Sequence, residues 1–244
     1  MANSINTNAG ALVALQNLNQ TSRDLSITQN RVNTGQKISS AKDNGAIFAI
    51  ATSQRAEMGA QDAVKQSLQR GQSIVDVALA AGETVTNALN ELKSLAVAIQ
   101  DDAGGATAFT DNGKKLVADY EAIVKEIHTS LAGAKFDGVN LFDAVTAGNE
   151  VQVSTNTSGG KFMLKGVSGS AGTALEFGGT VAAGVWTAAA TDAAKKTAYT
   201  AANVDTAVKA FATTLADLGT KSKSLDRQLT FTSKMQDALE VGIG

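Results

Sequence analysis

The 244-residue sequence contains no cysteine and no proline. Without cysteine, the chain has neither disulfide bonds nor thiolate chemistry. A globular chain of this length would carry about a dozen prolines at an average usage of ~5%. Because a proline ring kinks or ends a helix, its absence suits long uninterrupted helices. Aromatic residues make up only 5% of the chain, which is unlike the aromatic-rich lining of a typical ligand pocket.

Charge and long apolar runs are also scarce. The net charge is −2, and 18% of the residues are charged, so no overall basic field attracts nucleic acid or an anionic membrane. No run approaches ~18 apolar residues, so no membrane-spanning helix is predicted. Residues 1–10 lack the basic and then apolar pattern of a cleaved signal peptide. We therefore expect no nucleic-acid or membrane partner, and export, if any, without such a peptide.

Catalytic and metal-binding patterns are missing as well. His128 is the only histidine, and it is expected on the surface or in a groove of a helix, without metal-ligand spacing. Asp101 and Asp102 are expected to form a solvated helix end. Gly104 and Gly105 lack the Lys-Ser/Thr that follows the glycines of a phosphate-binding loop. The sequence predicts no enzyme and no cofactor.

Composition divides the chain into helical ends and a different middle. Residues 1–145 and 203–244 carry helical patterns, whereas residues 146–202 are rich in Gly, Ser, Thr and Ala. The predicted fold is mainly α: a long antiparallel coiled-coil-like helical bundle built from both chain ends, with a small β-hairpin-containing insert.

The strongest periodicity in the chain is a heptad pattern between residues 64 and 99. Apolar or small residues recur there with an unbroken spacing of four and three for about five heptads. Two of these positions are glycines, which cost about 1 kcal/mol each in a helix, so a neighbouring helix is expected to approach closely there. The positions are Val64, Leu68, Gly71, Val75, Ala78, Gly82, Val85, Leu89, Leu92, Ala96 and Ile99.

The same period returns near both ends of the chain. The C-terminal pattern includes Val204, Val208, Phe211, Leu215, Leu218, Leu225 and Leu229. Near the N-terminus, Leu18, Leu25 and Val32 recur every seven residues. Because the periods match, both ends are expected to pack in one bundle.

Two shorter elements are predicted between the long helices and the insert. Residues 111–132 fit a helix with the apolar stripe Leu116, Tyr120, Ile123, Ile127 and Leu131. A turn follows at residues 136–138, and residues 150–155 and 161–166 read as the strands of a β-hairpin.

Residues 31–51 (RVNTGQKISSAKDNGAIFAIA) closely resemble the N-terminal signature of bacterial flagellin. The opening residues 5–8 (INTN) and residues 136–141 (FDGVNL) are similar to that family too. The resemblance covers residues 1–142 and, more weakly, residues 204–244. The matching positions within the signature are Arg31, Gly35, Lys37, Ile38, Ser40, Ala41, Lys42, Asp43, Ala49, Ile50 and Ala51.

The resemblance implies a structural subunit of the flagellar filament that serves motility. Residues 1–42 would form the filament-core helix and its joint, and the insert would face solvent. The family also implies secretion by the flagellar export apparatus to the extracellular flagellum. Implied partners are other flagellin subunits, cap and junction proteins, and an export chaperone or regulator.

Three departures from the family pattern qualify this picture. Asn44-Gly45 and Phe48 differ from many members and look more like the flagellins of α-proteobacteria. The insert, of about 60 residues, leaves no room for the large outer domains of the longest flagellins. The chain also stops where the family continues for one more helix, and we expect this to be a truncation.

The candidate functional residues form four groups. The joint is assigned to Arg31, Gly35, Ser40, Ala41, Lys42 and Asp43. The self-assembly seam is assigned to Val64, Leu68, Val75, Val85, Leu89, Leu92, Ile99, Val208, Phe211, Leu215, Leu225 and Leu229. The resemblance places Glu91, Leu95 and Asp119 where recognised family members meet the vertebrate cell-surface flagellin receptor. Possible O-glycosylation sites are Ser154, Thr155, Thr157, Ser158, Ser168, Ser170 and Thr173.

Two other functions share the helical pattern. A hook–filament junction protein carries the same terminal signature, and a non-polymerising coiled-coil scaffold would have similar heptads. The continuous agreement over residues 31–51 favours flagellin over both. A protease-bearing flagellin is excluded because the chain has no His-Glu-x-x-His motif.

Overall fold

The computed structural model describes residues 8–142, 150–164, 174–182 and 185–243. The helices are α1 (Ala9–Thr34), α2 (Gly45–Gln100), α3 (Asp111–Gly133), α5 (Asp192–Ala198) and α6 (Ala201–Ile243). The strands are β1 (Lys135–Phe136), β2 (Val139–Asn140), β3 (Val151–Ser154), β4 (Lys161–Leu164), β5 (Thr180–Ala182) and β6 (Val185–Thr187). They pair as three antiparallel two-stranded sheets. The predicted fold class, a helical bundle with a small β insert, is confirmed.

The chain divides into two compact units. One unit contains residues 1–60 and 234–244, and the other contains residues 61–233. Both α2 and α6 contribute residues to each unit. None of the described helices is long and apolar enough to cross a membrane.

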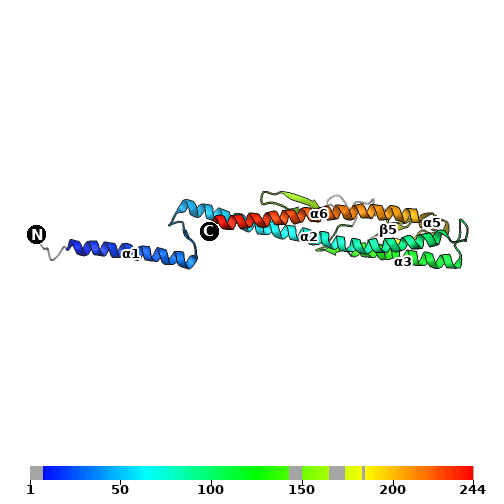
Figure 1. The fold of residues 1–244 in the computed structure, drawn as a ribbon, viewed down its shortest axis with the longest axis horizontal. Coiled ribbons are helices and arrows are strands. Elements are labelled where there is room, and N and C mark those ends of the chain that lie inside the picture. Colours follow the sequence, from blue (N-terminus) through cyan, green and yellow to red (C-terminus); the bar gives the residue numbers. More distant parts are fainter. Residues whose placement is uncertain (1–7, 143–149, 165–173, 183–184, 244) are drawn as a thin grey trace. The chain divides into compact units, whose positions relative to one another are not determined.

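In the unit of residues 61–233, α2, α3 and α6 lie side by side (Figure 1). Contacts between α2 and α6 run in opposite chain directions. Gln100 accepts a hydrogen bond from the Ala201 N–H, and Gln72 donates one to the Ser222 hydroxyl at 2.9 Å. This order makes the two helices antiparallel, as the heptad pattern predicts.

The heptad positions of α2 form the centre of this unit. Every position predicted between Val64 and Ile99 is buried, including both glycines. On α6, Val204, Phe211, Leu218 and Leu225 are buried at intervals of seven residues. The core therefore follows the period read from the sequence.

The two glycines in the α2 heptads are each in close contact with a different element. A Cβ at Gly82 would overlap the Leu215 side chain of α6. A Cβ at Gly71 would lie 2.6 Å from Cγ2 of Val153, which belongs to β3. The predicted close approach by a helix is thus found at Gly82, but a strand takes that place at Gly71.

The hairpin of β3 and β4 packs on α2 through this contact. Val151 pairs with Leu164 and Ser154 pairs with Lys161 across the sheet. The buried Val153 and Leu164 belong to the same apolar cluster as Leu68 of α2. The Ser154 N–H also donates to the Ser67 hydroxyl of α2 at 3.0 Å.

The turn between β1 and β2 is made by Asp137 and Gly138. Their φ angles are 50° and 76°, a left-handed conformation in which glycine is favoured and aspartate is tolerated. Asp137 is also tied to Arg70 of α2, with 2.6 Å between Oδ2 and Nε. This solvent-exposed ion pair links the turn to the long helix.

Part of the insert belongs to the core of the bundle. Leu175, Phe177, Trp186 and Tyr199 are at most 4% exposed and cluster with side chains of α2, α3 and α6. Tyr199 stacks on Tyr120 of α3 with 4.5 Å between ring centroids. The expectation of a purely surface-facing insert is therefore wrong for these residues.

The buried face of α3 differs from the predicted stripe by a small rotation. Val117, Val124 and His128 are buried together with Tyr120 and Ile127. The predicted Leu116, Ile123 and Leu131 are only partly buried. The rotation follows from the insert, which covers the side of α3 that carries His128.

His128 is a core residue, which corrects its expected place at the helix surface. It is 8% exposed, and its Nε2 lies 3.0 Å from the Leu175 carbonyl oxygen. Its ring is nearly parallel to that of Trp186, whose Nε1–H donates to the Glu176 carbonyl at 2.6 Å. Two ring nitrogens therefore hold two successive carbonyls of the insert.

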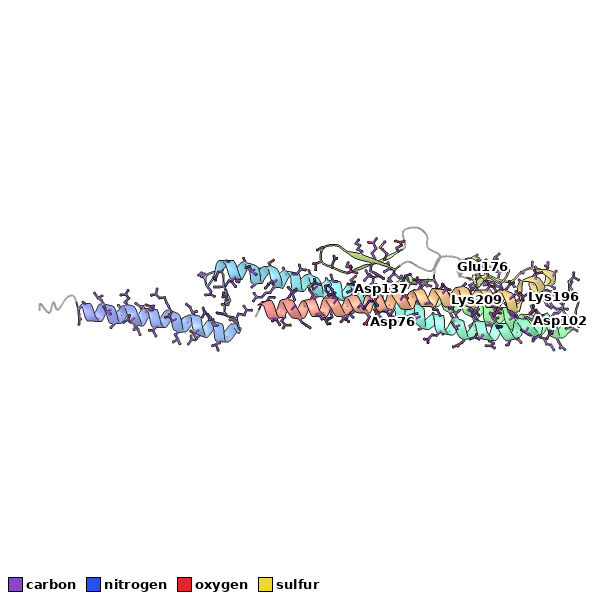
Figure 2. The ribbon with its side chains drawn as sticks, turned by 45° about the horizontal axis from the view of Figure 1, so that its top comes forward. Asp76, Asp102, Asp137, Glu176, Lys196 and Lys209 are labelled. Carbon is purple, nitrogen blue, oxygen red and sulfur yellow. The ribbon has the colours of Figure 1, made fainter. Side chains whose placement is uncertain are left out.

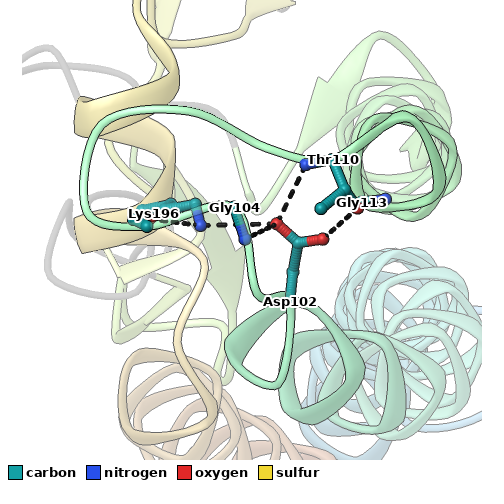
Figure 3. Close-up of polar contacts among 6 residues, drawn as sticks. Asp102, Gly104, Thr110, Gly113 and Lys196 are labelled. Atoms are coloured by element: carbon teal, nitrogen blue, oxygen red, sulfur yellow. Dashed lines mark hydrogen bonds and ion pairs between the residues drawn. The ribbon is translucent and has the colours of Figure 1, made fainter.

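Asp102 is likewise not the solvated helix end that was expected. Its side chain is 5% exposed and accepts hydrogen bonds from the Thr110 hydroxyl and from the N–H groups of Gly104 and Thr110 (Figure 3). Lys196 of α5 adds an ammonium 3.4 Å from Oδ2. The Thr110 hydroxyl bond, more than the opposing desolvation, holds the pKa of Asp102 below its usual value.

A second ion pair fastens α5 to the bundle. Lys195 lies 2.6 Å from Oε1 of Glu121 on α3, and the Tyr199 hydroxyl donates to the same oxygen at 3.1 Å. Figure 2 shows Asp102 and Lys196 at the end of the bundle where α5 lies. Successive lysines of one short helix thus bind two carboxylates on different elements.

The Gly71 contact gives a stability prediction. Replacing Gly71 with Ala should lower the free energy of unfolding by about 1–3 kcal/mol, because the new Cβ would lie 2.6 Å from Cγ2 of the buried, β-branched Val153. Gly219→Ala is the matched control on α6, since no atom beyond its chain neighbours and the adjacent helix backbone lies within 4 Å of its Cβ position. That variant should gain about 0.5–1 kcal/mol. Urea unfolding measures both, and equal stabilisation by the two substitutions would contradict the packing.

His128 gives a prediction about pH. Burial lowers its pKa, and the Leu175 carbonyl and Glu176 offset this only in part. The unfolded chain therefore binds the proton near pH ~6.5 and the folded chain only at lower pH. We expect the free energy of unfolding to fall as the pH drops below about 6.5 and to level off below the folded pKa.

Fluorescence of Trp186, the only tryptophan, reports this unfolding. His128→Gln should be less stable than the parent chain but nearly independent of pH between about pH 7 and 5.5, where histidine is the side chain that ordinarily titrates. An equal pH slope in both proteins would show that His128 is not the titrating group.

Candidate self-association surface

Helix α1 is closed at both ends by local residues. The Asn8 side chain accepts hydrogen bonds from the N–H groups of Gly10 and Ala11 at 3.1 and 3.3 Å, which caps the first turn. Gly35 ends the helix at a φ of 66°, a left-handed conformation that glycine adopts without strain. These caps explain where α1 begins and ends, but they supply no tertiary packing.

No residue of α1 is buried. Its large apolar side chains are 40–76% exposed, and they are Leu12, Val13, Leu15, Leu18, Leu25, Ile27 and Val32. Helices in water derive most of their stability from packing an apolar face. A 26-residue helix with this composition and no buried side chain therefore has an unused contact surface.

Most of these apolar residues share one face of α1. Leu18, Leu25 and Val32 follow each other at intervals of seven, and Leu15 precedes Leu18 by three positions. Residues at these spacings lie above one another on a helix. We call this set, Leu15, Leu18, Leu25 and Val32, the α1 stripe.

Other apolar side chains of the same unit are also exposed. Ile47 and Ile50 lie in the first turns of α2, and Met235 and Val241 lie near the end of α6. Their exposed fractions range from 38% to 82%. The unit of residues 1–60 and 234–244 thus carries a high share of exposed apolar side chains.

The joint between α1 and α2 is organised by Asp43. Its Oδ2 accepts hydrogen bonds from the N–H and hydroxyl groups of Ser39 and Ser40, at 3.2–3.5 Å. Desolvation opposes the effect, but these bonds and the charge of Arg31 lower the pKa of Asp43. The carboxylate therefore stays ionised and holds the loop.

The remaining joint residues surround this loop. Arg31 lies in the last turn of α1, Gly35 ends that helix, and Ala41 and Lys42 are exposed. Ser40 is half-buried and contributes both donors to Asp43. The structure thus brings Ser40, Asp43 and the charge of Arg31 together, whereas Ala41 and Lys42 make no recorded polar contact among the described residues.

The residues assigned to the self-assembly seam lie inside the chain. Those on α2 are 0–4% exposed, as are Phe211 and Leu225 on α6, while Val208, Leu215 and Leu229 are half-buried. The chain's own helices and hairpins already cover these side chains. Their role in contacts between copies stays a prediction, and their burial gives it no support.

The proposed receptor residues lie on the bundle surface. Glu91 on α2 and Asp119 on α3 are exposed, and Leu95 is partly buried against the core. Among the hydroxyl residues of the insert, Thr157 and Ser158 are exposed at the tip of the β3–β4 hairpin, and Ser154 and Thr155 are half-buried. Ser168, Ser170 and Thr173 lie outside the described residues.

Sequence reasoning included three of the four residues of the α1 stripe but did not treat them as a surface in its own right. The heptad recurrence of Leu18, Leu25 and Val32 was visible, but it predicted packing within one bundle. One signal could have distinguished the heptads of α1 from those of α2. On α2 every heptad position is apolar or small, whereas on α1 the polar Thr21 and Thr28 take the positions between Leu18, Leu25 and Val32.

Comparisons with known proteins find relatives over most of the chain. A family model described as the bacterial flagellin N-terminal helical region matches residues 5–147, more than half of the chain. Flagellin FljM of Caulobacter vibrioides is 43% identical over 242 residues, which cover 99% of this chain and 83% of the relative. A flagellin of Brucella melitensis is 35% identical over 246 residues, covering 99% of this chain and 84% of the relative.

A solved structure shares the fold at lower identity. The crystal structure of Bacillus cereus flagellin matches with a TM-score of 0.52 and 20% identity, over 68% of this chain and 88% of that chain. The extent of the family match and the identity of the two relatives decide the assignment. This chain belongs to the bacterial flagellin family.

Proposed function

We propose that this flagellin joins its neighbours in the filament through the α1 stripe. As a flagellin, the chain is a structural subunit of the extracellular flagellar filament and assembles with other flagellin subunits. The observation that supports the stripe as the contact is its exposure. It is a heptad-spaced apolar face of the chain with no buried side chain, whereas the heptads of α2 lie in the core.

Self-association would bury the α1 stripe and stabilise the helix. Burial of one Leu or Val side chain contributes on the order of 1.5–3 kcal/mol. The stripe has four such residues, and the joint held by Asp43 would set the direction in which α1 leaves α2. A junction protein and a scaffold would also be compatible with the heptads. The relatives are named flagellins, which favours neither of these two functions.

The proposal predicts a loss of association when charge enters the stripe. Leu18→Asp/Leu25→Asp should weaken self-association of the protein by at least about tenfold, because two apolar contacts are lost and two charges are desolvated. Sedimentation velocity across a concentration series measures the change.

Gln16→Asp/Gln20→Asp is the matched control. It adds the same charge on the opposite side of α1, as judged from the helical period. The control should associate like the parent protein. Equal association of parent and stripe variant, with the helical circular dichroism unchanged, would overturn the α1 stripe as the contact.

We also propose that Glu91 weakens recognition by the vertebrate cell-surface flagellin receptor. An arginine there would offer a planar fork of donors, whereas the exposed Glu91 offers only acceptors. In a reporter-cell assay, the unmodified protein should be weak or inactive, and Glu91→Arg should activate more strongly. Activation by the unmodified protein at nanomolar concentration would contradict this proposal.

The finer assignments are part of the same proposal. We infer secretion through the flagellar export apparatus, contacts with cap and junction proteins, and an export chaperone or regulator as a transient partner. The division into residues 1–42, 43–145, 146–202 and 203–244, and O-glycosylation at Thr157 and Ser158, also remain predictions. A structural rather than enzymatic role agrees with the flagellin relatives.

A further inference from the structure

We propose that Asn44 is a site of spontaneous deamidation, and that the fold protects the same tripeptide elsewhere in the chain. The sequence Asp-Asn-Gly occurs at residues 43–45 and again at residues 111–113. Both copies lie at the start of a long helix, α2 or α3. The two asparagines therefore differ in their surroundings and not in their nearest neighbours along the chain.

The reaction needs only water as a second reactant. The backbone nitrogen of Gly45 gives up its proton to water and attacks Cγ of Asn44. A C–N bond forms, the bond between Cγ and Nδ2 breaks, and the side-chain nitrogen takes up a proton from water and leaves as ammonia. The product is a five-membered succinimide. Water then opens either carbonyl and leaves aspartate or isoaspartate at position 44.

The surroundings of Asn44 are open to this attack. Asn44 and Gly45 are exposed, and apart from its chain neighbours and the adjacent helix backbone, no atom lies within 4 Å of the Cβ position of Gly45. Among the hydrogen bonds of the described residues, none has the Gly45 N–H as its donor. The attacking nitrogen is therefore accessible and has no hydrogen bond to lose.

The Asn44 carbonyl is also polarised. Its Oδ1 accepts hydrogen bonds from the N–H groups of Ala46 and Ile47, at 3.1 and 3.2 Å. Negative charge develops on this oxygen when the ring closes. Donors already aimed at such an oxygen stabilise the transition state.

The second copy of the tripeptide is held differently. Here Thr110, and not the asparagine, caps the helix, so that Asn112 already lies within the first turn of α3. The Gly113 N–H, which would have to attack, donates to the Thr110 hydroxyl at 3.1 Å. Gly113 is buried, and a Cβ on it would lie 2.6 Å from Cγ of Asp102. The nitrogen of Gly113 is therefore both bonded and confined by the contacts around Asp102.

The two products at position 44 have different consequences for the joint. Aspartate keeps an acceptor oxygen for the first turn of α2 and adds negative charge where the helix dipole favours it. Isoaspartate moves the main chain through the former side chain and adds a methylene group, which removes the cap. The isoaspartate form alone should lose helical order at the start of α2.

Ageing of the purified full chain in mildly alkaline buffer tests the proposal. Samples are taken with time, digested and mapped by mass spectrometry, and isoaspartate is detected with an isoaspartyl methyltransferase. A parallel sample in urea gives the rates for the unfolded chain, in which the two tripeptides should react alike. In the native sample, Asn44 should react at least about tenfold faster than Asn112, which corresponds to ~1.4 kcal/mol in barrier height.

Two variants sharpen the result. Gln in place of Asn44 should abolish the early modification, because its ring closure is slower. Thr110→Val removes the acceptor of the Gly113 N–H and should speed deamidation at Asn112 while leaving Asn44 unchanged. Native rates at Asn44 that are suppressed as strongly as those at Asn112 would overturn the proposal, and so would faster reaction at Asn112.

Discussion

The antiparallel contact between α2 and α6 is the constraint on which the larger unit depends. It joins parts of the chain that are more than a hundred residues apart, from Gln100 with Ala201 to Gln72 with Ser222. Once these helices are paired, the segment between them must return to the end of the bundle where it started. The helix α3, the insert and α5 make that return, and Lys195 and Lys196 fasten its last helix to Glu121 and Asp102. The pairing of α2 with α6 therefore determines where the segment between them begins and ends, and the ion pairs of α5 add contacts at that end.

Periodicity predicted the long helices because their stability is distributed over many equivalent positions. A single error in reading one heptad leaves the others intact, and the buried residues of α2 agree with the pattern from Val64 to Ile99. The β-turn at Asp137 and Gly138 was predictable for another reason. Few residue types adopt a positive φ readily, and the Asp-Gly pair is typical of such turns. Both signals are local, and both appear in the structure.

Leu175, Phe177 and Trp186 were not predictable from the sequence, because they stand in short apolar pieces (ALEF and GVW) of a Gly-, Thr- and Ala-rich stretch that are too short to show a period. Their burial comes from contacts with helices distant in the chain, which leave no period behind. The same long-range contacts place His128 in the core and rotate the buried face of α3. Asp102 was assigned to solvent because a carboxylate at a helix end is ordinarily solvated, whereas here the following loop wraps around it. The burial of polar residues such as His128 and Asp102 thus depends on contacts with segments that fold back on them, and composition does not reveal those contacts.

We propose different roles for the two seams of the same period, because the seam of α2 already has its partners within the chain. The heptads of α2 are closed by α6, α3 and a β-hairpin, so opening them to a neighbour would expose the core. The side chains of the α1 stripe are exposed, so their contact with a neighbour would not require the α2 core to open. A chain that used one seam for both tasks would have to unfold in part in order to assemble. An assembly contact on α1, as proposed, would leave the α2 core closed, and the hydrogen bonds of Asp43 would order the loop between α1 and α2.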